Sequence, residues 1–246
     1  NVYRRQLQMC IRDRYSLGLN TTGTSNVAVG TNALDANTTG VDSVAIGVDA
    51  LGAQTAGGDN VAIGHLALST LTTAGNNVAV GDRAMQASTS GENNVAVGTL
   101  AMDANTTGGS NVGVGRDALG ANTTGSNSTA VGKAALHTTT TQSNNTAVGF
   151  QSLYTLNGGA DNTAMGHNSL FNATTADNNV AIGKSAMENV TSGSANTAIG
   201  KEALDANTTA DNNVAIGSGC LGSNTTGANS TSVGTGALNA QTTGHS

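Results

Sequence analysis

The stretch Asn26–Gly30, with the sequence NVAVG, decides the fold because it recurs along the chain in fixed register. Its glycine occurs thirteen times at intervals of seventeen residues, with no insertion or deletion between copies. A fixed period of this length is typical of a solenoid, in which each repeat forms one coil of a stack. The glycines of this register, here the glycine column, are Gly30, Gly47, Gly64, Gly81, Gly98, Gly115, Gly132, Gly149, Gly166, Gly183, Gly200, Gly217 and Gly234.

The repeat consensus, N-V-A-V/I-G-x-x-A-L-x-A-N-T-T-G-x-N, contains two short apolar segments. Val27 and Val29 flank Ala28, and this alternation of β-branched residues at period two predicts a strand. The segment from Ala33 to Ala36 is expected to form a second strand, and Leu or Met stands at the place of Leu34 in every full copy.

Turns are expected after each apolar segment. The glycine column permits a positive φ or a close backbone approach, and the Thr38–Gly40 region supplies the second turn. Helices of four or five residues are marginal, so a helical solenoid is disfavoured. The sequence therefore predicts an all-β fold, a parallel β-solenoid of about thirteen coils of seventeen residues.

A column of amides begins each repeat. If coils stack in register, these side chains form a ladder in which each amide satisfies the hydrogen bonds of its neighbour. Serine stands in this column at positions 43, 128 and 230, and the asparagines are Asn26, Asn60, Asn77, Asn94, Asn111, Asn145, Asn162, Asn179, Asn196 and Asn213.

Composition excludes several classes of function. The chain of 246 residues has a net charge of −6, and such a surface repels phosphate backbones, so we expect no nucleic-acid partner. No apolar run of eighteen residues occurs, so no membrane insertion is expected of this chain. Two cysteines exclude a disulfide framework and a cysteine zinc site, and we expect no metal or cofactor.

The chain divides into residues 1–15 and a continuous repeat array over residues 16–246. The first part is basic, with four arginines and one aspartate, which leaves a charge of −9 for the remainder. It resembles translated adaptor sequence, and we interpret it as a non-native leader; the alternative is an ordinary basic tail. We expect the chain to be a fragment of a longer protein.

Four aromatic or imidazole side chains form the candidate contact surface. His137, Tyr154 and Phe171 occupy the same position in successive repeats, and Phe150 lies nearby in sequence. Exposed rings can stack on sugar faces, and the alternative is simple stacking among themselves. The ionisable residues are otherwise scattered over different repeats, so the sequence predicts no catalytic constellation and no enzyme.

Three further surface features have competing interpretations. Sequons at Asn37, Asn105, Asn122, Asn207 and Asn224 are candidate glycosylation sites, although Asn and Thr are also good turn formers. Asp42, Asp59 and Asp161 share one column, but one acid per coil suits a turn better than a calcium site. The Thr38 column suggests ice binding, although the neighbouring Thr39 column is expected to point away from it.

The recurring pentapeptide, as in Asn60–Gly64 and Asn213–Gly217, resembles the head repeat of trimeric autotransporter adhesins of the YadA type, and is similar to repeats of bacteriophage tail fibres. The resemblance implies a left-handed β-roll, a homotrimer, and exposure on a cell or virion surface for attachment. The period of seventeen is longer than the usual repeat of that family. No coiled-coil stalk accompanies it, so trimerisation rests on the resemblance.

Two arrangements of the strand residues compete. If Ala28 faces the interior, Val27 and Val29 form an apolar strip outside, which favours association of copies. Alternatively Val27, Val29 and Leu34 all fill the interior of a monomer, and Ala28 lies outside.

We therefore expect an extracellular structural and adhesive fibre module, associated with itself and contacting host glycans or matrix proteins. The alternative is a filament subunit that stacks head to tail and carries glycans; an ice-binding solenoid is a lesser alternative.

Overall fold

The computed structural model describes residues 9–11 and 15–243, and this part of the chain contains short parallel β-strands and turns but no helix. Contacts divide the chain into two units: Asn1–Asp117 with Asn122–Thr124, and Ala118–Ala121 with Gly125–Ser246. Among the described residues, no helix is long and apolar enough to cross a membrane.

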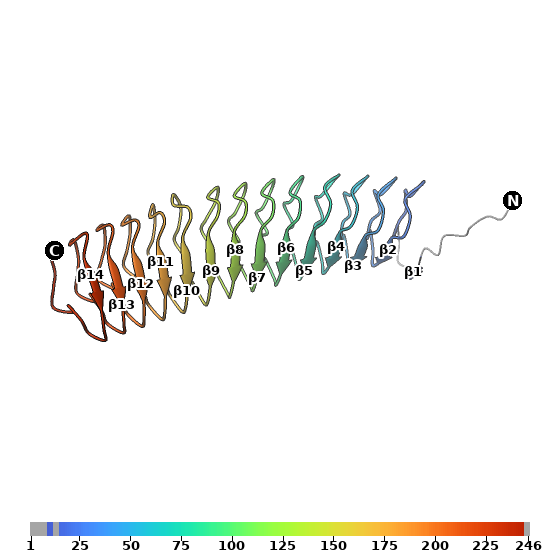
Figure 1. Ribbon diagram of the computed structural model, residues 1–246. Helices are drawn as coiled ribbons and strands as arrows, with labels where there is room; N and C mark the ends of the chain where they lie inside the picture. Colours follow the sequence, from blue (N-terminus) through green and yellow to red (C-terminus); the bar gives the residue numbers. More distant parts are fainter. Residues whose placement is uncertain (1–8, 12–14, 244–246) are drawn as a thin grey trace. The chain divides into compact units, whose positions relative to one another are not determined.

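In the first unit, each strand pairs in parallel with the strand of the next coil (Figure 1). The register places Val27 beside Val44 and Ala28 beside Ala45, so residues seventeen apart are direct neighbours. The strands are β1 (Met9–Ile11), β2 (Val27–Val29), β3 (Val44–Ile46), β4 (Val61–Ile63), β5 (Val78–Val80), β6 (Val95–Val97) and β7 (Val112–Val114).

The second unit continues the same pattern of parallel pairing, with Thr163 beside Val180 as one example. Its strands are β8 (Thr129–Val131), β9 (Thr146–Val148), β10 (Thr163–Met165), β11 (Val180–Ile182), β12 (Thr197–Ile199), β13 (Val214–Ile216) and β14 (Thr231–Val233). One strand per repeat from β2 to β14 confirms the predicted all-β solenoid with coils of seventeen residues.

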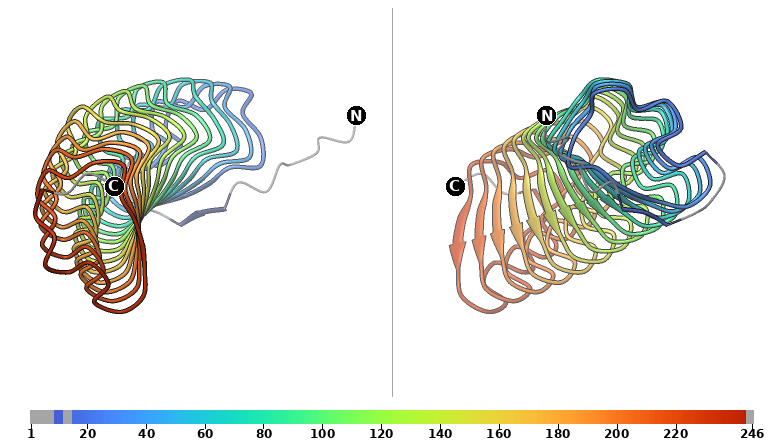
Figure 2. Two further views of the ribbon diagram at one scale, coloured as in Figure 1. Left: turned by 60° about the vertical axis from the view of Figure 1, so that its left-hand side comes forward. Right: turned by 90° about the vertical axis from the view of Figure 1, so that its right-hand side faces the viewer.

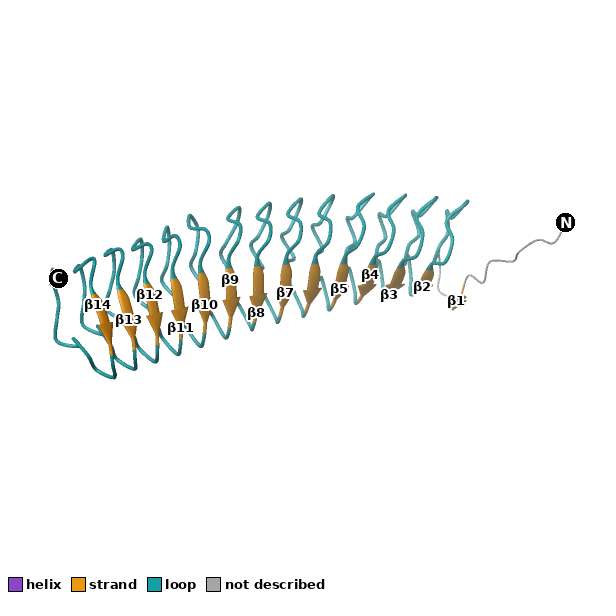
Figure 3. Cartoon of the chain, in the orientation of Figure 1, coloured by secondary structure: helices purple, strands orange, loops and turns teal. Residues whose placement is uncertain are grey.

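Each coil holds one strand, and turns make up the rest of the circuit (Figure 3). The expected second strand over 33–36 is wrong, because Asn32 and Leu34 have φ values of 57° and 52°. Extended strands need negative φ at every residue. The segment still joins the next coil through single hydrogen bonds, such as the one that the Leu34 N–H donates to the Ala50 carbonyl at 3.1 Å.

The interior of each unit is filled by three columns of apolar side chains that repeat from coil to coil. Figure 2 shows the backbone circuits of successive coils, one behind another, that enclose this interior. Ala28, Ala33 and Leu34 are fully buried, and so are their counterparts Ala45, Ala50 and Leu51. The small alanines bring the strand close to the opposite wall, while the Leu or Met of each coil supplies most of the buried volume. One such side chain contributes about 1.5–3 kcal/mol when buried.

One strand lies before the expected start of the repeat array at residue 16, where the sequence predicted none. β1 lies within the basic leader and pairs with β2, with Met9 opposite Val27. The offset is eighteen residues rather than seventeen, so β1 extends the stack outside the repeat register. The leader's residues 1–8 and 12–14 lie outside the described part of the chain. The interpretation of the leader as non-native stays a prediction.

Candidate functional site

The strands present an apolar surface to the outside of the coil. Their middle residues, such as Ala28 and Ala62, are fully buried, whereas Ile63 and Ile199 are 36% and 38% exposed. We call the first and third residues of strands β2 to β14 the outer strip. The arrangement with Ala28 inside is therefore the observed one, and the alternative that buries Val27 and Val29 is wrong, although it placed Leu34 correctly.

The glycine column ends each strand and allows neighbouring coils to approach closely. Gly30 has a φ of +127°, a region that residues with a side chain avoid. A Cβ on Gly30 would lie 2.6 Å from the carbonyl oxygen of Gly47 in the next coil. Conformation and space thus both require glycine at this position.

The asparagine column forms a buried ladder that joins each coil to the next. The Asn77 N–H donates to Oδ1 of Asn60 at 3.0 Å, and Asn77 Nδ2 donates to the Gly91 carbonyl at 2.9 Å. Asn94 repeats the pattern, because its N–H donates to Oδ1 of Asn77 at 3.0 Å. Each amide therefore accepts from the backbone N–H of the next coil and donates to the carbonyl of a turn fourteen residues ahead, and the column is structural rather than a ligand site.

A second buried column contains the sequon asparagines. Asn37, Asn105, Asn122, Asn207 and Asn224 are all at most 1% exposed. The Asn224 amide closes its own turn, because Nδ2 donates to the Gly227 carbonyl at 2.7 Å and the Gly227 N–H donates to Oδ1 at 3.0 Å. The folded coil has no room for a glycan on these amides, so these five glycosylation candidates are wrong, and the sequons reflect turn formation.

The aromatic column of the second unit is a continuous stack. His137 and Tyr154 have ring centroids 5.2 Å apart and planes within 6°, and Tyr154 and Phe171 are 5.2 Å apart within 9°. Each ring thereby covers a face of its neighbour, which leaves mainly edges for solvent. Stacking among themselves is thus the observed arrangement, and the faces that a sugar would need are largely occupied.

Phe150 belongs to a different column, because its ring stacks on His167 with centroids 5.3 Å apart. The ammonium of Lys133, which belongs to the preceding coil, lies 5.7 Å from the centroid of the Phe150 ring. These residues directly follow the glycine column, as do Lys184 and Lys201. We call the exposed set Lys133, Phe150, His167, Lys184 and Lys201 the basic column.

Sequence reasoning treated these basic residues as scattered. The signal was nevertheless present, because all three lysines of the chain stand directly after a glycine of the glycine column. The same position holds His65 and Asp82 in the first unit, where His65 Nδ1 and Asp82 Oδ1 are 2.8 Å apart. The hydrogen bond with His65, assisted by one with Arg83, lowers the pKa of Asp82.

Two aspartates have the opposite tendency. Burial raises the pKa of Asp205, and the nearby carboxylates of Glu188 and Glu202 raise it further. Burial also raises the pKa of Asp35, against the lowering effect of backbone hydrogen bonds. Asp205 lines a small pocket with Glu202 and Ser223, and Asp35 lines one with Tyr15 and Asn32. In the described ranges, no cluster of three or more His, Cys, Asp or Glu could hold a metal ion.

The acidic turn column has a conformational role. Asp42, Asp59 and Asp161 have φ values of 52°, 56° and 58°. Asn and Asp tolerate this left-handed region better than other residues with side chains. The interpretation of this column as a turn is therefore confirmed.

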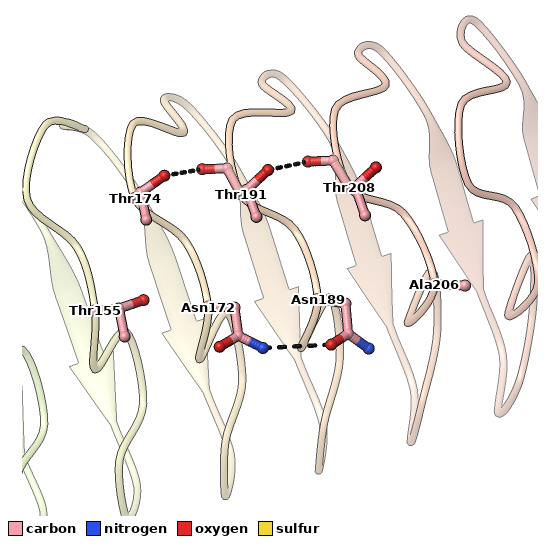
Figure 4. Close-up of a pocket in the computed structure, with 7 residues that line it drawn as sticks. All are labelled: Thr155, Asn172, Thr174, Asn189, Thr191, Ala206 and Thr208. Carbon is pink, nitrogen blue, oxygen red and sulfur yellow. Dashed lines mark hydrogen bonds between the residues drawn. The ribbon is translucent and has the colours of Figure 1, made fainter.

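The threonine column lines an open groove of about 600 Å³ in the second unit (Figure 4). Thr174 Oγ1 donates to the Thr191 carbonyl, and Thr191 Oγ1 to the Thr208 carbonyl, each at 3.0 Å. Beside it, Asn172 Nδ2 donates to Asn189 Oδ1 at 3.3 Å. The hydroxyl protons therefore bind the neighbouring coil. The Thr39 side chain is exposed rather than turned inward, contrary to the expectation for this segment.

The comparisons with known proteins leave the family open. No protein-family model matches this chain, and no curated protein matches it. The resemblance to the YadA-type head repeat consequently rests on the recurring pentapeptide alone.

Proposed function

We propose that this chain is a structural and adhesive module of an extracellular surface fibre. The observation that carries the proposal is the outer strip, in which the third residue of every strand from β2 to β14 is a Val, Ile or Met that is exposed or half-buried. Apolar surface of this extent marks an interaction site in a soluble protein. The inner columns of the coil are nearly uniform, with Ala at most strand centres and Leu or Met at the place of Leu34, while the outer positions vary.

The strip is best covered by further copies of the same chain. Three copies arranged around one axis would each bury a strand face, and equivalent residues would meet at equivalent heights because every coil has the same length. Closed symmetric association of this kind is the usual solution for identical subunits. In this arrangement the turns and the basic column remain at the periphery, where they can contact a host surface.

Sedimentation velocity tests the association. The wild-type chain is expected to sediment as a trimer, and the double variant Ile199→Glu, Ile216→Glu as a monomer with an unchanged far-ultraviolet circular dichroism spectrum. Two glutamates in a buried interface repel one another and lose hydration. The control Thr209→Glu, Thr226→Glu adds the same charge to exposed turn positions and is expected to remain trimeric.

Two results would overturn the proposal. If the wild-type chain were monomeric at all concentrations, the outer strip would not mediate association between copies. Open-ended growth with concentration in electron micrographs would favour the head-to-tail filament instead. Hydrolytic turnover in a broad substrate screen would show that the chain is an enzyme, provided that a point substitution abolishes the activity.

A further inference from the structure

The basic column is an unusual feature in an acidic protein. The chain carries a net charge of −6, yet Lys133, Lys184 and Lys201 project from one column within five successive coils of the second unit. The intervening places are filled by Phe150 and His167, and all five side chains are exposed. The parallel register of β8 to β13 fixes this alignment.

The positive charges of this column are only partly neutralised. Lys201 Nζ lies 3.2 Å from Glu202 Oε1, an exposed pair that contributes little to stability. Lys133 faces the Phe150 ring at 5.7 Å rather than a carboxylate. Lys184 forms no ion pair within the described part of the chain. At least two ammonium groups are therefore free to bind an anion.

The spacing of the column follows from the strands. Neighbouring coils are about 4.8 Å apart, so the five positions extend over roughly 19 Å in a single file. The file has one charged side chain per coil at most, and the Phe150–His167 pair supplies an apolar edge in its middle. This arrangement is narrow and linear, and it combines cations with ring surface.

We infer that the basic column binds a linear acidic polysaccharide, with sulfate or carboxylate groups on the lysines and sugar C–H groups on Phe150. A nucleic acid duplex is disfavoured because strong binding neutralises about six to ten phosphates, and the column offers three lysines. A membrane surface is disfavoured because a planar surface would also bring anionic lipids against the acidic remainder of the protein, whereas a single polysaccharide chain can contact the column alone. A flexible chain with spaced anions matches a single file best.

This inference rests on the proposed adhesive role, for which it names the class of ligand. It differs from the earlier sugar-binding expectation, which relied on ring faces of His137, Tyr154 and Phe171. Here the charges select the ligand, and the ring edge of Phe150 adds contact area.

Binding to fluorescent dextran sulfate tests the inference, with neutral dextran of equal length as the comparison. The triple variant Lys133→Gln, Lys184→Gln, Lys201→Gln is expected to bind dextran sulfate at least tenfold more weakly and to show a shallower salt dependence. The control Arg83→Gln removes a cation that is paired with Asp82 in the first unit and does not directly follow the glycine column, and it is expected to bind as the wild type does.

Equal binding by the wild type and the triple variant would overturn the inference, as would equal affinity for neutral dextran. Tighter binding of single-stranded DNA or of phosphatidylserine vesicles than of dextran sulfate would assign the column to another class of partner and reject a polysaccharide. Sedimentation of the wild-type chain beside the binding assay separates the two proposals. A wild-type trimer that does not bind dextran sulfate rejects this inference alone, whereas a wild-type monomer that binds it rejects the association.

Discussion

The backbone N–H of Asn77 donates to the side-chain oxygen of Asn60, which lies seventeen residues earlier, at 3.0 Å. Asn77 in turn presents its own Oδ1 to the N–H of Asn94 at 3.0 Å. Both partners are fully buried. The relationship means that a side chain of one coil completes the backbone hydrogen bonding of the next, so the stability of each coil depends on its neighbour.

Replacement of Asn77 is expected to weaken the stack. Asn77→Ala leaves the buried Asn94 N–H without its acceptor, which costs about 1–3 kcal/mol in free energy of unfolding. Asn77→Ser should lose less, because Ser43 accepts from the Asn60 N–H at 3.4 Å in the same column. Urea unfolding of the two variants measures the difference, and equal losses would contradict the role assigned to the ladder.

The glycine column should tolerate no side chain. In Gly98→Ala the new Cβ would lie 2.7 Å from the Gly115 carbonyl oxygen at a φ of +138°, so we expect a loss of about 3 kcal/mol. Gly52→Ala is the control, because its Cβ would meet no atom closer than 3.4 Å. Thermal unfolding compares them. Equal melting temperatures for the two variants would contradict the conclusion that the close approach of neighbouring coils requires glycine at this position.

The leucine and strand positions should differ in what they stabilise. Leu68→Ala removes a fully buried side chain and should lower the free energy of unfolding by about 2–5 kcal/mol. Ile63→Ala, at a residue 36% exposed, should cost the isolated chain less than about 1 kcal/mol and instead weaken association. Unfolding at low protein concentration and sedimentation at high concentration measure these two effects. A large loss for Ile63→Ala at low concentration would contradict its outward position.

Extension of the aromatic stack should stabilise the second unit. The Nδ1 atom of His137 is buried and has no hydrogen-bond partner among the residues that the structure describes. His137→Phe removes this unsatisfied atom and keeps a flat ring against Tyr154, so we expect a gain of about 1 kcal/mol. Differential scanning calorimetry checks the gain, with His167→Phe as a matched change at an exposed ring. A lower melting temperature for His137→Phe would indicate an unrecognised role for the imidazole.

The raised pKa of Asp205 predicts a pH-dependent effect of its replacement. Because the folded-state pKa lies above the ordinary value of an aspartate, about 3.9, the stability that this group contributes is present below that ordinary value. It is lost as the pH rises through the folded pKa, where ionisation is disfavoured by burial and by Glu188. Asp205→Asn should therefore match the wild type at pH 3 and exceed it by about 0.5 kcal/mol at pH 7. Chemical denaturation at both pH values measures this, and a gain of equal size at pH 3 would refute the assignment.

The candidate surface was only partly accessible to sequence reasoning. The stacking of His137 on Tyr154 followed from the period, because residues seventeen apart must be neighbours in register. The partner of Phe150 was missed, since Phe150 and Tyr154 are close in sequence but lie in different columns. The burial of the sequon asparagines was also missed. A sequon is a local triplet, and it does not show whether its asparagine side chain faces the interior of the coil or the solvent.

The sequence by itself determined the coil length, the parallel register and the identity of every column, because a strict period leaves each residue only one kind of neighbour. Only the tertiary structure decided which columns face inward and which residues bend the chain. A three-residue strand has too little alternation to show its buried face, and the positive φ of Leu34 has no marker in a leucine. The closed path of the coil decides both the buried face of the strand and the residues with positive φ. It places the small Ala28 in the narrow interior and leaves Val27 and Val29 facing outward.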